Sequence, residues 1–463
     1  YSHGHYRGPY GEKDIGNEYS DQPQDHEDHS GDEHERTRAE RLYDDEKGAG
    51  HYENYSYGER VHEGNDGVTR IKTFADSLLE MLMECELMHK GEPVAVMDID
   101  ENGHILGIAS VVCIEHMPPG TVYDGEADPD DLRGWWDRRC IPDARPGIGR
   151  LLGSLQASDR REMLMGSQAL NLSDQYWIRR DPATEWEDAS FFRNPFPPDV
   201  GDVLFGSEAE GIDPSSPDIA TDGVLMKRWS IIDGERCLVK SGTEGILQEP
   251  FNEVIASMLM GSQNILHTGY RLEWIDGLPC SVCRDFITED TELVTAARVV
   301  DSNVAVTNGS YRDEYARICR ELGIDAHLEQ MDVIDAIMMN TDRHLGNYGL
   351  IRDAETLEYL GPAPIYDTGT SLMCRTATEN IVGAIPSMAD DISKDGRISG
   401  RDLEWVDTDA MRDTLPAIKK LLRDGAERLD GRGLSPMRAD ALVSVLDNRI
   451  DGLERLIRSS RRR

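Results

Sequence analysis

The sequence has 463 residues, and its 88 acidic against 49 basic side chains give a formal net charge of −39 at pH 7. Free nucleic acid and anionic membrane surfaces repel a chain this acidic, and its eight scattered Cys do not form the pattern of a disulfide scaffold. No stretch reaches the roughly 18 apolar residues of a membrane span, and residues 1–60 lack the apolar core of a signal peptide. We therefore expect a cytoplasmic protein of two or three domains, at roughly 150 residues per domain.

Residues 1–65 differ in composition from the rest of the chain. They are rich in acidic residues, His and Tyr, and they contain almost no Leu, Ile, Val or Phe. Such a segment buries too little apolar surface to offset its ordering entropy, so we expect a disordered acidic tail. Its histidines could bind metal adventitiously, but an unstructured polar tail without a specific ligand is the simpler interpretation.

Residues 66–199 are predicted to form a small α+β subdomain. Apolar residues at helical spacing from Phe74 to Met83 predict a first helix. The dipeptide Asn102-Gly103 between two apolar runs is a strong hairpin signal. A further helix is expected around residues 145–172.

The pattern changes near residue 200, where short strands come first and helices follow. Asp233-Gly234 joins two predicted strands, and the second of these ends in Lys240. Pro250 starts a helix with Glu253 in its first turn. The C-terminal helix is expected to begin at Ser435-Pro436, and the terminal arginines complement its dipole, although they could also touch phosphate.

The segment 340–369 holds polar residues in an order that suggests phosphoryl transfer. Asp342 and Asn347 lie five positions apart just after an apolar helix, and a predicted hairpin then leads to Asp367. In such a reaction one Asp orients or deprotonates the attacking hydroxyl, and an Asn and a second Asp hold Mg²⁺ through oxygen atoms. Asp-x₄-Asn followed by Asp-x-Gly is the arrangement of protein kinases, and Gly369 completes it. The alternative without a catalytic role is a polar loop capped by Asp and Asn.

The upstream sequence supplies the other groups that a kinase needs. A Lys at the end of a strand binds the α- and β-phosphates in kinases, and Lys240 lies at such a position. The next helix should carry a Glu that pairs with this Lys. Glu249 and Glu253 are both candidates, and we prefer Glu253 because it lies inside the helix.

The connection between two kinase lobes is expected after the strand that begins at Leu278. Backbone groups near Cys283 would bind the adenine ring there. Cys280-x₂-Cys283 also resembles half of a zinc site, but a single pair without a second pair or a nearby His is a weak signal.

With these residues assembled, the chain resembles the HipA-like kinase family. The resemblance covers roughly residues 200–460 and rests on the segments 340–347 and 364–367 and on Lys240. It implies a kinase that binds ATP and Mg²⁺ and phosphorylates Ser or Thr of a protein substrate. By this resemblance Asp342 is the catalytic base, Asn347 and Asp367 are the Mg²⁺ ligands, and Lys240 binds phosphate. His344, which follows Asp342, is expected to orient the loop.

The resulting fold class is α+β, with a two-lobed protein-kinase-like fold. A disordered tail (1–65) and a small α+β subdomain (66–199) precede a small β-rich N-lobe (200–290) and a helical C-lobe (291–463). Relatives in the family often work with an antitoxin-like or DNA-binding partner chain, and we expect neither direct nucleic-acid binding nor membrane binding. The family's phosphate-covering loop can be placed only loosely, between Gly211 and Gly223, where Ser215 and Ser216 are candidates for autophosphorylation.

Three alternatives compete with a protein kinase. Phosphatidylinositol kinases share Asp-Arg-His-x-x-Asn and a later Asp-x-Gly, but a net charge of −39 suits a membrane enzyme poorly. A pseudokinase that acts as a binding module is a second alternative, although all the expected polar residues are present. A DNA-binding regulator is the third, and the acidity of the chain opposes it.

Overall fold

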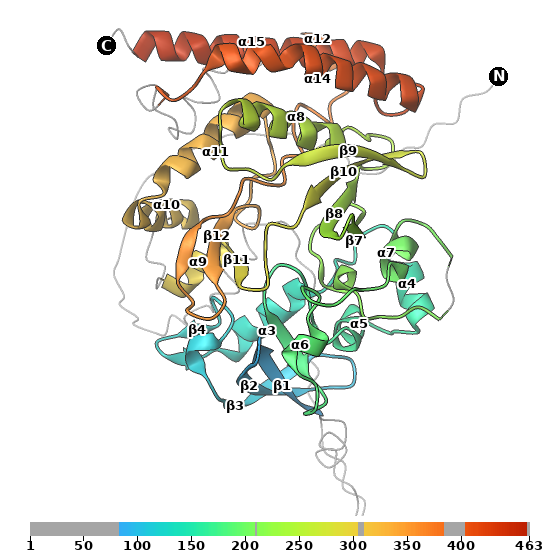
Figure 1. Ribbon diagram of the computed structural model, residues 1–463, viewed down its shortest axis with the longest axis vertical. Helices are drawn as coiled ribbons and strands as arrows, with labels where there is room; N and C mark the ends of the chain where they lie inside the picture. The colour runs from blue at the N-terminus through green and yellow to red at the C-terminus, as the bar shows by residue number, and fades with distance from the viewer. Residues whose placement is uncertain (1–82, 209–210, 304–309, 384–402, 461–463) are drawn as a thin grey trace, which may run out of the picture. The chain divides into compact units, whose positions relative to one another are not determined.

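The computed structural model describes residues 83–208, 211–303, 310–383 and 403–460, all within one compact unit that spans Arg60–Arg463. They form an α+β fold of antiparallel sheets and helices (Figure 1). The predicted acidic tail, the predicted first helix before Met83 and the last three arginines lie outside the described residues. None of the helices in the described ranges is both long enough and apolar enough to cross a membrane.

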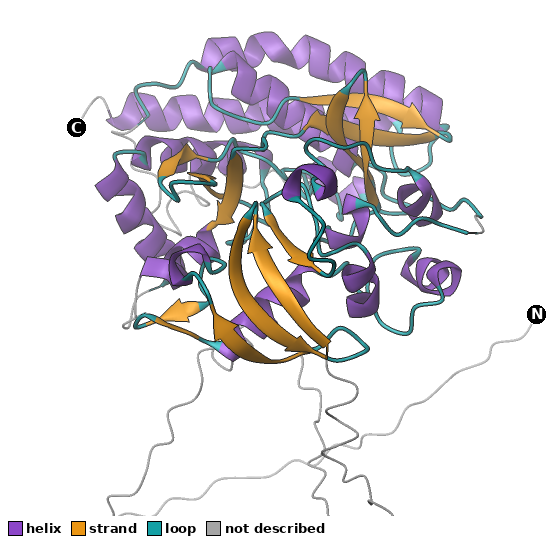
Figure 2. Ribbon diagram, turned by 60° about the horizontal axis from the view of Figure 1, so that its bottom comes forward, coloured by secondary structure: helices purple, strands orange, loops and turns teal. Residues whose placement is uncertain are grey.

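A four-stranded antiparallel sheet begins the described chain, with the strand order β3-β2-β1-β6. Figure 2 shows its long strands side by side. The hairpin predicted at Asn102-Gly103 is confirmed, because β2 pairs antiparallel with β3 and Gly103 adopts a φ of +84°. The strands are β1 Met83–His89, β2 Glu92–Ile99, β3 Ile105–Val111 and β6 Tyr176–Arg179.

Short helices cover this sheet, and one of them corrects the sequence analysis. The single helix expected around residues 145–172 is wrong, since α4 ends at the left-handed residue Gln156 and α5 begins only after Asp159, which caps it. The elements are η1 Ile114–His116, β4 Val122–Tyr123, β5 Glu126–Ala127, α3 Pro129–Arg139, α4 Ile148–Leu155, α5 Arg160–Gly166, α6 Trp186–Ala189, α7 Asp199–Leu204 and η2 Pro217–Ala220. Apolar side chains of α7 and η2 share one hydrophobic core with this sheet.

A second antiparallel sheet has the strand order β7-β8-β10-β9 and carries helix α8. The predicted hairpin at Asp233-Gly234 is confirmed, and both residues have positive φ angles, of +53° and +83°. Pro250 lies in the first turn of α8, as predicted. The elements are β7 Lys227–Ile232, β8 Glu235–Ser241, α8 Glu249–Ser262, β9 Tyr270–Ile275 and β10 Leu278–Arg284.

The rest of the described chain is mainly helical. Its three-stranded sheet has the order β11-β12-β13, and α14 and α15 run side by side in Figure 1. Ser435 caps α15 by accepting a hydrogen bond from the Arg438 N–H, in agreement with the predicted helix start. The elements are β11 Thr291–Thr295, α9 Ala296–Asn303, α10 Tyr311–Leu322, α11 Asp325–Met338, β12 Gly349–Asp353, β13 Tyr359–Pro362, α12 Thr378–Gly383, α14 Thr408–Leu429 and α15 Pro436–Ser460.

The largest hydrophobic core joins α8 to the helical part of the chain. Phe251 of α8 is fully buried, and α8 packs against both α14 and α11. Burying this much apolar surface fixes α8 against the segments that follow α11. The core therefore decides where the polar residues of α8 meet those of the loop after α11.

Candidate active site

The centre of the site is an ion-pair cluster of three residues that are far apart in the sequence. Lys240 lies at the end of β8, Glu253 in α8, and Asp367 in the loop after β13. The Lys240 Nζ atom lies 3.0 Å from Asp367 Oδ1 and 3.5 Å from Glu253 Oε1. Lys240 and Glu253 are almost fully buried, whereas the Asp367 side chain is 30% exposed. Of the two carboxylates in the cluster, Asp367 is thus the one that solvent, and therefore a ligand, can reach.

The pKa values of the cluster follow from burial and from these charges. Burial disfavours the charged carboxylate of Asp367, but the ammonium of Lys240 outweighs it and holds the pKa of Asp367 well below its usual range. Burial likewise opposes the charge of Lys240, and Asp367 above all raises the pKa of Lys240 well above normal. Burial raises the pKa of Glu253. Asp367 is therefore a permanent anion at physiological pH.

Helix α8 also fixes the backbone around Asp367. Glu253 accepts hydrogen bonds from both the N–H and the hydroxyl of Thr368, each at 3.0 Å. Asn252 donates to the carbonyl oxygens of Gly369 and Ser371, each at 2.8 Å. Asp367 has a φ of +56°, an unusual conformation for a residue other than glycine, which its neighbours hold in place.

The loop after α11 places Asp342 and Asn347 on one turn of chain. Asn340 Oδ1 accepts a hydrogen bond from the Asp342 N–H, and Asn347 Nδ2 donates to the Asp342 carbonyl oxygen at 2.9 Å. The Asp342 residue is exposed, and its Oδ2 atom accepts a 3.4 Å hydrogen bond from the Thr370 hydroxyl. Asn347 is nearly buried, and among the described residues none donates a hydrogen bond to its Oδ1 atom. The hydrogen bond from Nδ2 to the Asp342 carbonyl thus orients the amide and leaves Oδ1 without a described donor.

Arg343 is a residue of the site that the sequence analysis did not single out. Its guanidinium is paired with Asp335 at 2.9 and 3.0 Å and donates to the carbonyl oxygens of Asn347 and Tyr366 at 2.8 and 2.6 Å. Arg343 thus ties the Asp342 loop to the residue just before Asp367. Its position beside Asp342 was visible in the sequence, but its partners were not.

Three further sequence predictions concern single side chains. Cys283 lies inside β10 with its thiol buried, and it pairs with Leu238 of β8 and Tyr270 of β9, so adenine binding by backbone groups near it stays a prediction. His344 accepts a hydrogen bond from the Gly346 N–H through Nδ1, as expected of a residue that shapes the loop. Ser216 is fully buried and caps η2, whereas Ser215 is exposed. Of the two serines, Ser215 is the accessible one.

The donor set fits a magnesium nucleotide better than a dedicated metal cage. Among the described residues no group of three or more His, Cys, Asp or Glu side chains could hold a metal ion. Mg²⁺ commonly uses one or two protein oxygens and takes its other ligands from phosphates and water. The Asp367 carboxylate and the Asn347 amide oxygen would serve as such a pair, and Lys240 would be the cation for phosphate.

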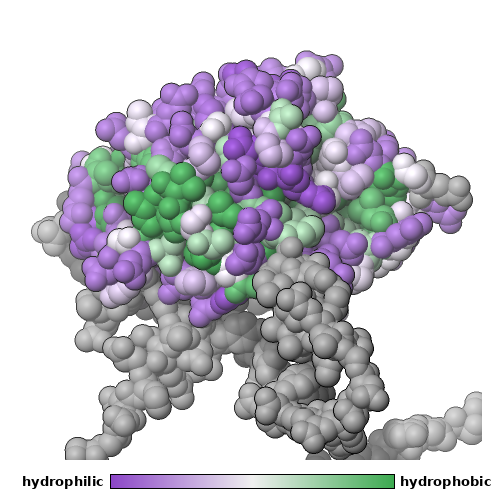
Figure 3. Space-filling model, turned by 90° about the horizontal axis from the view of Figure 1, so that it is seen from below, coloured by the Kyte–Doolittle hydropathy of each residue, from purple (hydrophilic) through white to green (hydrophobic). Residues whose placement is uncertain are grey.

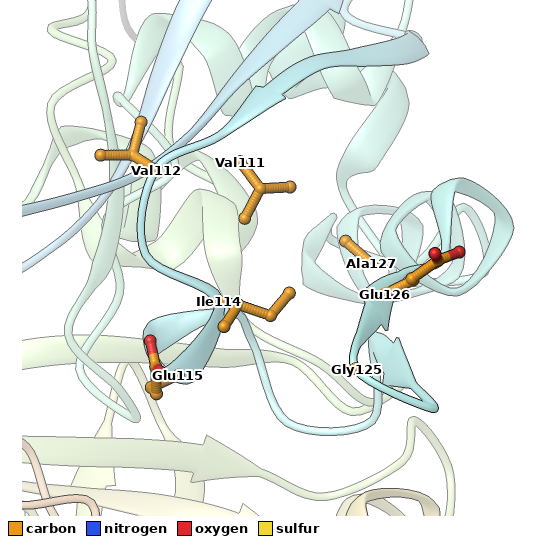
Figure 4. Close-up of a pocket in the computed structure, with 7 residues that line it drawn as sticks. All are labelled: Val111, Val112, Ile114, Glu115, Gly125, Glu126 and Ala127. Carbon is orange, nitrogen blue, oxygen red and sulfur yellow. The ribbon is translucent and has the colours of Figure 1, made fainter.

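A separate hollow lies near the end of β3 and the β4–β5 turn, away from this cluster (Figure 4). Its charged lining residues are Glu115 and Glu126, so it offers no cation to a phosphate group. Val111 and Val112 at its edge are exposed, and apolar residues also gather on the face of the molecule that Figure 3 shows. This hollow has no role in the nucleotide site.

No protein-family model matches this chain, and no curated protein matches its sequence. Solved structures with a similar fold include the following two. The proinflammatory kinase CtkA of Helicobacter pylori is 19% identical over 50% of this chain and 95% of its own, with a TM-score of 0.36. HipA of Shewanella oneidensis MR-1, solved with HipB and operator DNA, is 11% identical over 82% of this chain and 99% of its own, with a TM-score of 0.44.

One of these two neighbours is a HipA, the family that the sequence resembles. Both TM-scores describe a distant likeness, and neither protein's activity or partner follows for this chain from it. The chemistry of the site has to be inferred from its own residues.

Proposed function

We propose that the protein is an ATP- and Mg²⁺-dependent kinase that transfers the γ-phosphate of ATP to Ser or Thr of a protein. The observation that carries the proposal is the cluster in which Lys240 contacts Glu253 and Asp367 together. A buried Lys held by a helix Glu and placed beside a metal-binding Asp is the ground plan of a phosphoryl-transfer site. A purely structural salt bridge needs one carboxylate rather than two, and it does not need a strained, partly exposed Asp.

Each residue has a defined part in this proposal. Lys240 binds the nonreacting phosphates, and Glu253 keeps its ammonium in place. Asp367 and Asn347 hold Mg²⁺, which when bound offsets charge on the phosphates. Asp342, exposed at the loop surface, accepts the proton of the attacking hydroxyl. Most of the rate enhancement then comes from positioning and charge stabilisation.

The test incubates the protein with radiolabelled ATP and Mg²⁺ and measures the transfer of label to the protein itself and to an added mixture of acceptor proteins. We expect Asp342→Asn to lower the rate by about 10²–10⁴, the usual contribution of a general base, while ATP binding persists. Asp367→Asn should abolish the Mg²⁺-dependent reaction. Asp409→Asn is the matched control, because this Asp has a 94% exposed side chain at the start of α14. Wild-type rates in both site variants would refute the proposal.

The acceptor is determined in the same experiment. Acid hydrolysis of the labelled product identifies phospho-Ser or phospho-Thr, and vesicles containing phosphatidylinositol test the lipid-kinase alternative. Nucleotide binding without transfer to any acceptor, or no nucleotide binding, would favour a pseudokinase. A cytoplasmic location and an antitoxin-like or DNA-binding partner chain remain part of the proposal, and co-purification of the tagged full chain from its own cells tests the partner.

A further inference from the structure

Among the described residues, the carboxylate of Asp342 has a single hydrogen-bond donor, the hydroxyl of Thr370. Thr370 Oγ1 lies 3.4 Å from Asp342 Oδ2. The neighbouring cation, Arg343, is paired with Asp335 and not with Asp342. Asp342 is exposed, so its carboxylate keeps one orientation only if the donor that it contacts is itself held in place.

The backbone around Thr370 is held by helix α8. Asn252, which is fully buried, donates to the carbonyl oxygens of the residues on both sides, Gly369 and Ser371, each at 2.8 Å. The Ser371 N–H also donates to the Gly369 carbonyl oxygen at 2.8 Å, which closes a three-residue turn with Thr370 at its centre. The Thr370 hydroxyl is therefore presented from a backbone that cannot move independently of α8.

The loop that carries Asp342 is joined to the same turn by backbone contacts. The Thr370 carbonyl oxygen accepts hydrogen bonds from the N–H and the hydroxyl of Thr341, at 3.2 and 3.4 Å. The Leu372 N–H donates to the Met338 carbonyl oxygen at 2.7 Å. These contacts hold the two segments together without the Thr370 hydroxyl, so that hydroxyl acts on the Asp342 carboxylate and not on the joining of the loops.

The contact leaves the carboxylate able to act as a base. A general base has to lie within about 2.6–3.2 Å of the group whose proton it accepts, and its lone pair has to point at that group. A donor at Oδ2 limits rotation of the Asp342 carboxylate, whereas Oδ1 has no donor among the described residues. Oδ1 is thus the oxygen that can accept the proton of an incoming hydroxyl.

We propose that Thr370 is a positioning residue, whose hydroxyl orients the Asp342 carboxylate toward the acceptor hydroxyl of the protein substrate. This inference rests on the proposed function, because it takes Asp342 to be the base. As the acceptor oxygen bonds to the γ-phosphorus and ADP leaves, the proton of the acceptor passes to Asp342, and Thr370 keeps its own. Helix α8 then serves both halves of the site, since it fixes Asp367 through Glu253 and Thr370 through Asn252.

The test compares Thr370→Val, which keeps the shape of the side chain but has no hydroxyl, with Thr370→Ser, which keeps the hydroxyl. Label transfer to the mixture of acceptor proteins is measured at varied Mg²⁺–ATP. In Thr370→Val we expect the maximal rate to fall about fivefold to thirtyfold, somewhat less than a buried hydrogen bond to a charged group contributes, because water reaches Asp342. The KM for ATP should stay within about twofold of wild type, since the hydroxyl acts on the base and not on the nucleotide.

The Ser variant and a control on α14 separate positioning from a general effect of substitution. Thr370→Ser should retain the maximal rate within about threefold of wild type. Thr414→Val is the control, because the Thr414 hydroxyl donates only to the Met411 carbonyl oxygen of its own helix, at 2.6 Å. All three variants should unfold at the temperature of the wild type, because the backbone contacts between the two segments remain.

Three results would overturn the inference while the proposed function stands. They are a wild-type maximal rate in Thr370→Val, an equal loss in Thr370→Val and Thr370→Ser, and a phosphate group found on Thr370 by mass spectrometry, which would make it an acceptor. A wild type that transfers no label would refute the proposed function, and this inference with it.

Discussion

Replacing Arg145 by Met should loosen the segment Thr221–Gly223, which we call the 221–223 loop and which ends the region where the phosphate-covering loop is expected from the sequence. Arg145 lies in the turn between α3 and α4 and is 1% exposed. Its Nη2 donates to the carbonyl oxygens of Thr221 and Asp222, each at 2.6 Å, its Nε to that of Gly223 at 2.9 Å, and its Nη1 to the Thr221 hydroxyl. The 221–223 loop is thus held by a residue that comes from the N-terminal part of the chain.

The expected loss of loop stability follows from these hydrogen bonds. A hydrogen bond to a charged donor contributes about 1.5–3 kcal/mol, so the three carbonyl contacts set an upper bound of roughly 5–9 kcal/mol. Two effects reduce it. Burial lowers the pKa of Arg145 to about 10, so its partners offset only part of the free-energy cost of burying its charge. In the variant, water can also hydrogen-bond some of the carbonyl oxygens that Arg145 no longer contacts. We therefore expect a loss of about 3 kcal/mol in loop stability, which corresponds to at most roughly 150-fold in ATP affinity.

The assay compares Arg145→Met with Arg423→Met, whose guanidinium pairs with Asp440 on the surface of α14 and α15. We expect Arg145→Met to weaken ATP binding between tenfold and 150-fold, and to make the bond after Asp222 or Gly223 more sensitive to limited proteolysis. Added ATP should restore protection. Wild-type ATP affinity together with a loop that resists protease would show that Arg145 does not hold the loop in place.

Two further predictions concern packing and protonation. In Gly425→Ala the new Cβ would lie 2.2 Å from the Phe251 ring. This overpacking should lower the free energy of unfolding, measured by urea titration, by about 1–3 kcal/mol. An unchanged free energy of unfolding would show that α14 can move away from Phe251 without cost. Asp218 is fully buried, and burial raises its pKa to about 7. Its neutral carboxyl therefore contributes fully to stability below about pH 4, and this contribution is lost as the pH rises toward 7. In Asp218→Asn the unfolding temperature should fall less over this pH range, and an unaltered pH profile would contradict the prediction.

The identity of the cluster residues was predictable because their signals are local. Asp233-Gly234 fixed a hairpin whose second strand carries Lys240, and Pro250 marked the helix that carries Glu253. Turn and helix-start preferences depend on a few neighbouring residues, so they can be read without knowing the fold. The order of Asp342, Asn347 and Asp367 could be read in the same way, and their roles as catalytic base and metal ligands stay predictions.

The helix expected around residues 145–172 shows where local signals fail. Apolar spacing alone cannot place the left-handed residue Gln156 that ends α4, nor the capping role of Asp159 that starts α5. Both depend on how the chain packs against the first sheet. The start of α3 at Asp128-Pro129 carried a readable signal, an Asp cap followed by Pro, that the sequence analysis did not use.

By itself the sequence determined the class of the fold, the strand and helix that carry Lys240 and Glu253, and the order of the polar residues after α11. Only the tertiary structure decided that Arg145 holds a loop 76 residues away, that Arg343 ties the Asp342 loop to Tyr366, and that Lys240 contacts Glu253 and Asp367 together. The physical reason is that secondary structure follows from interactions between near neighbours in the chain. Hydrogen bonds to backbone carbonyls carry no signature of their partner in the sequence, and an ion pair between distant residues is defined only by how the chain packs in space.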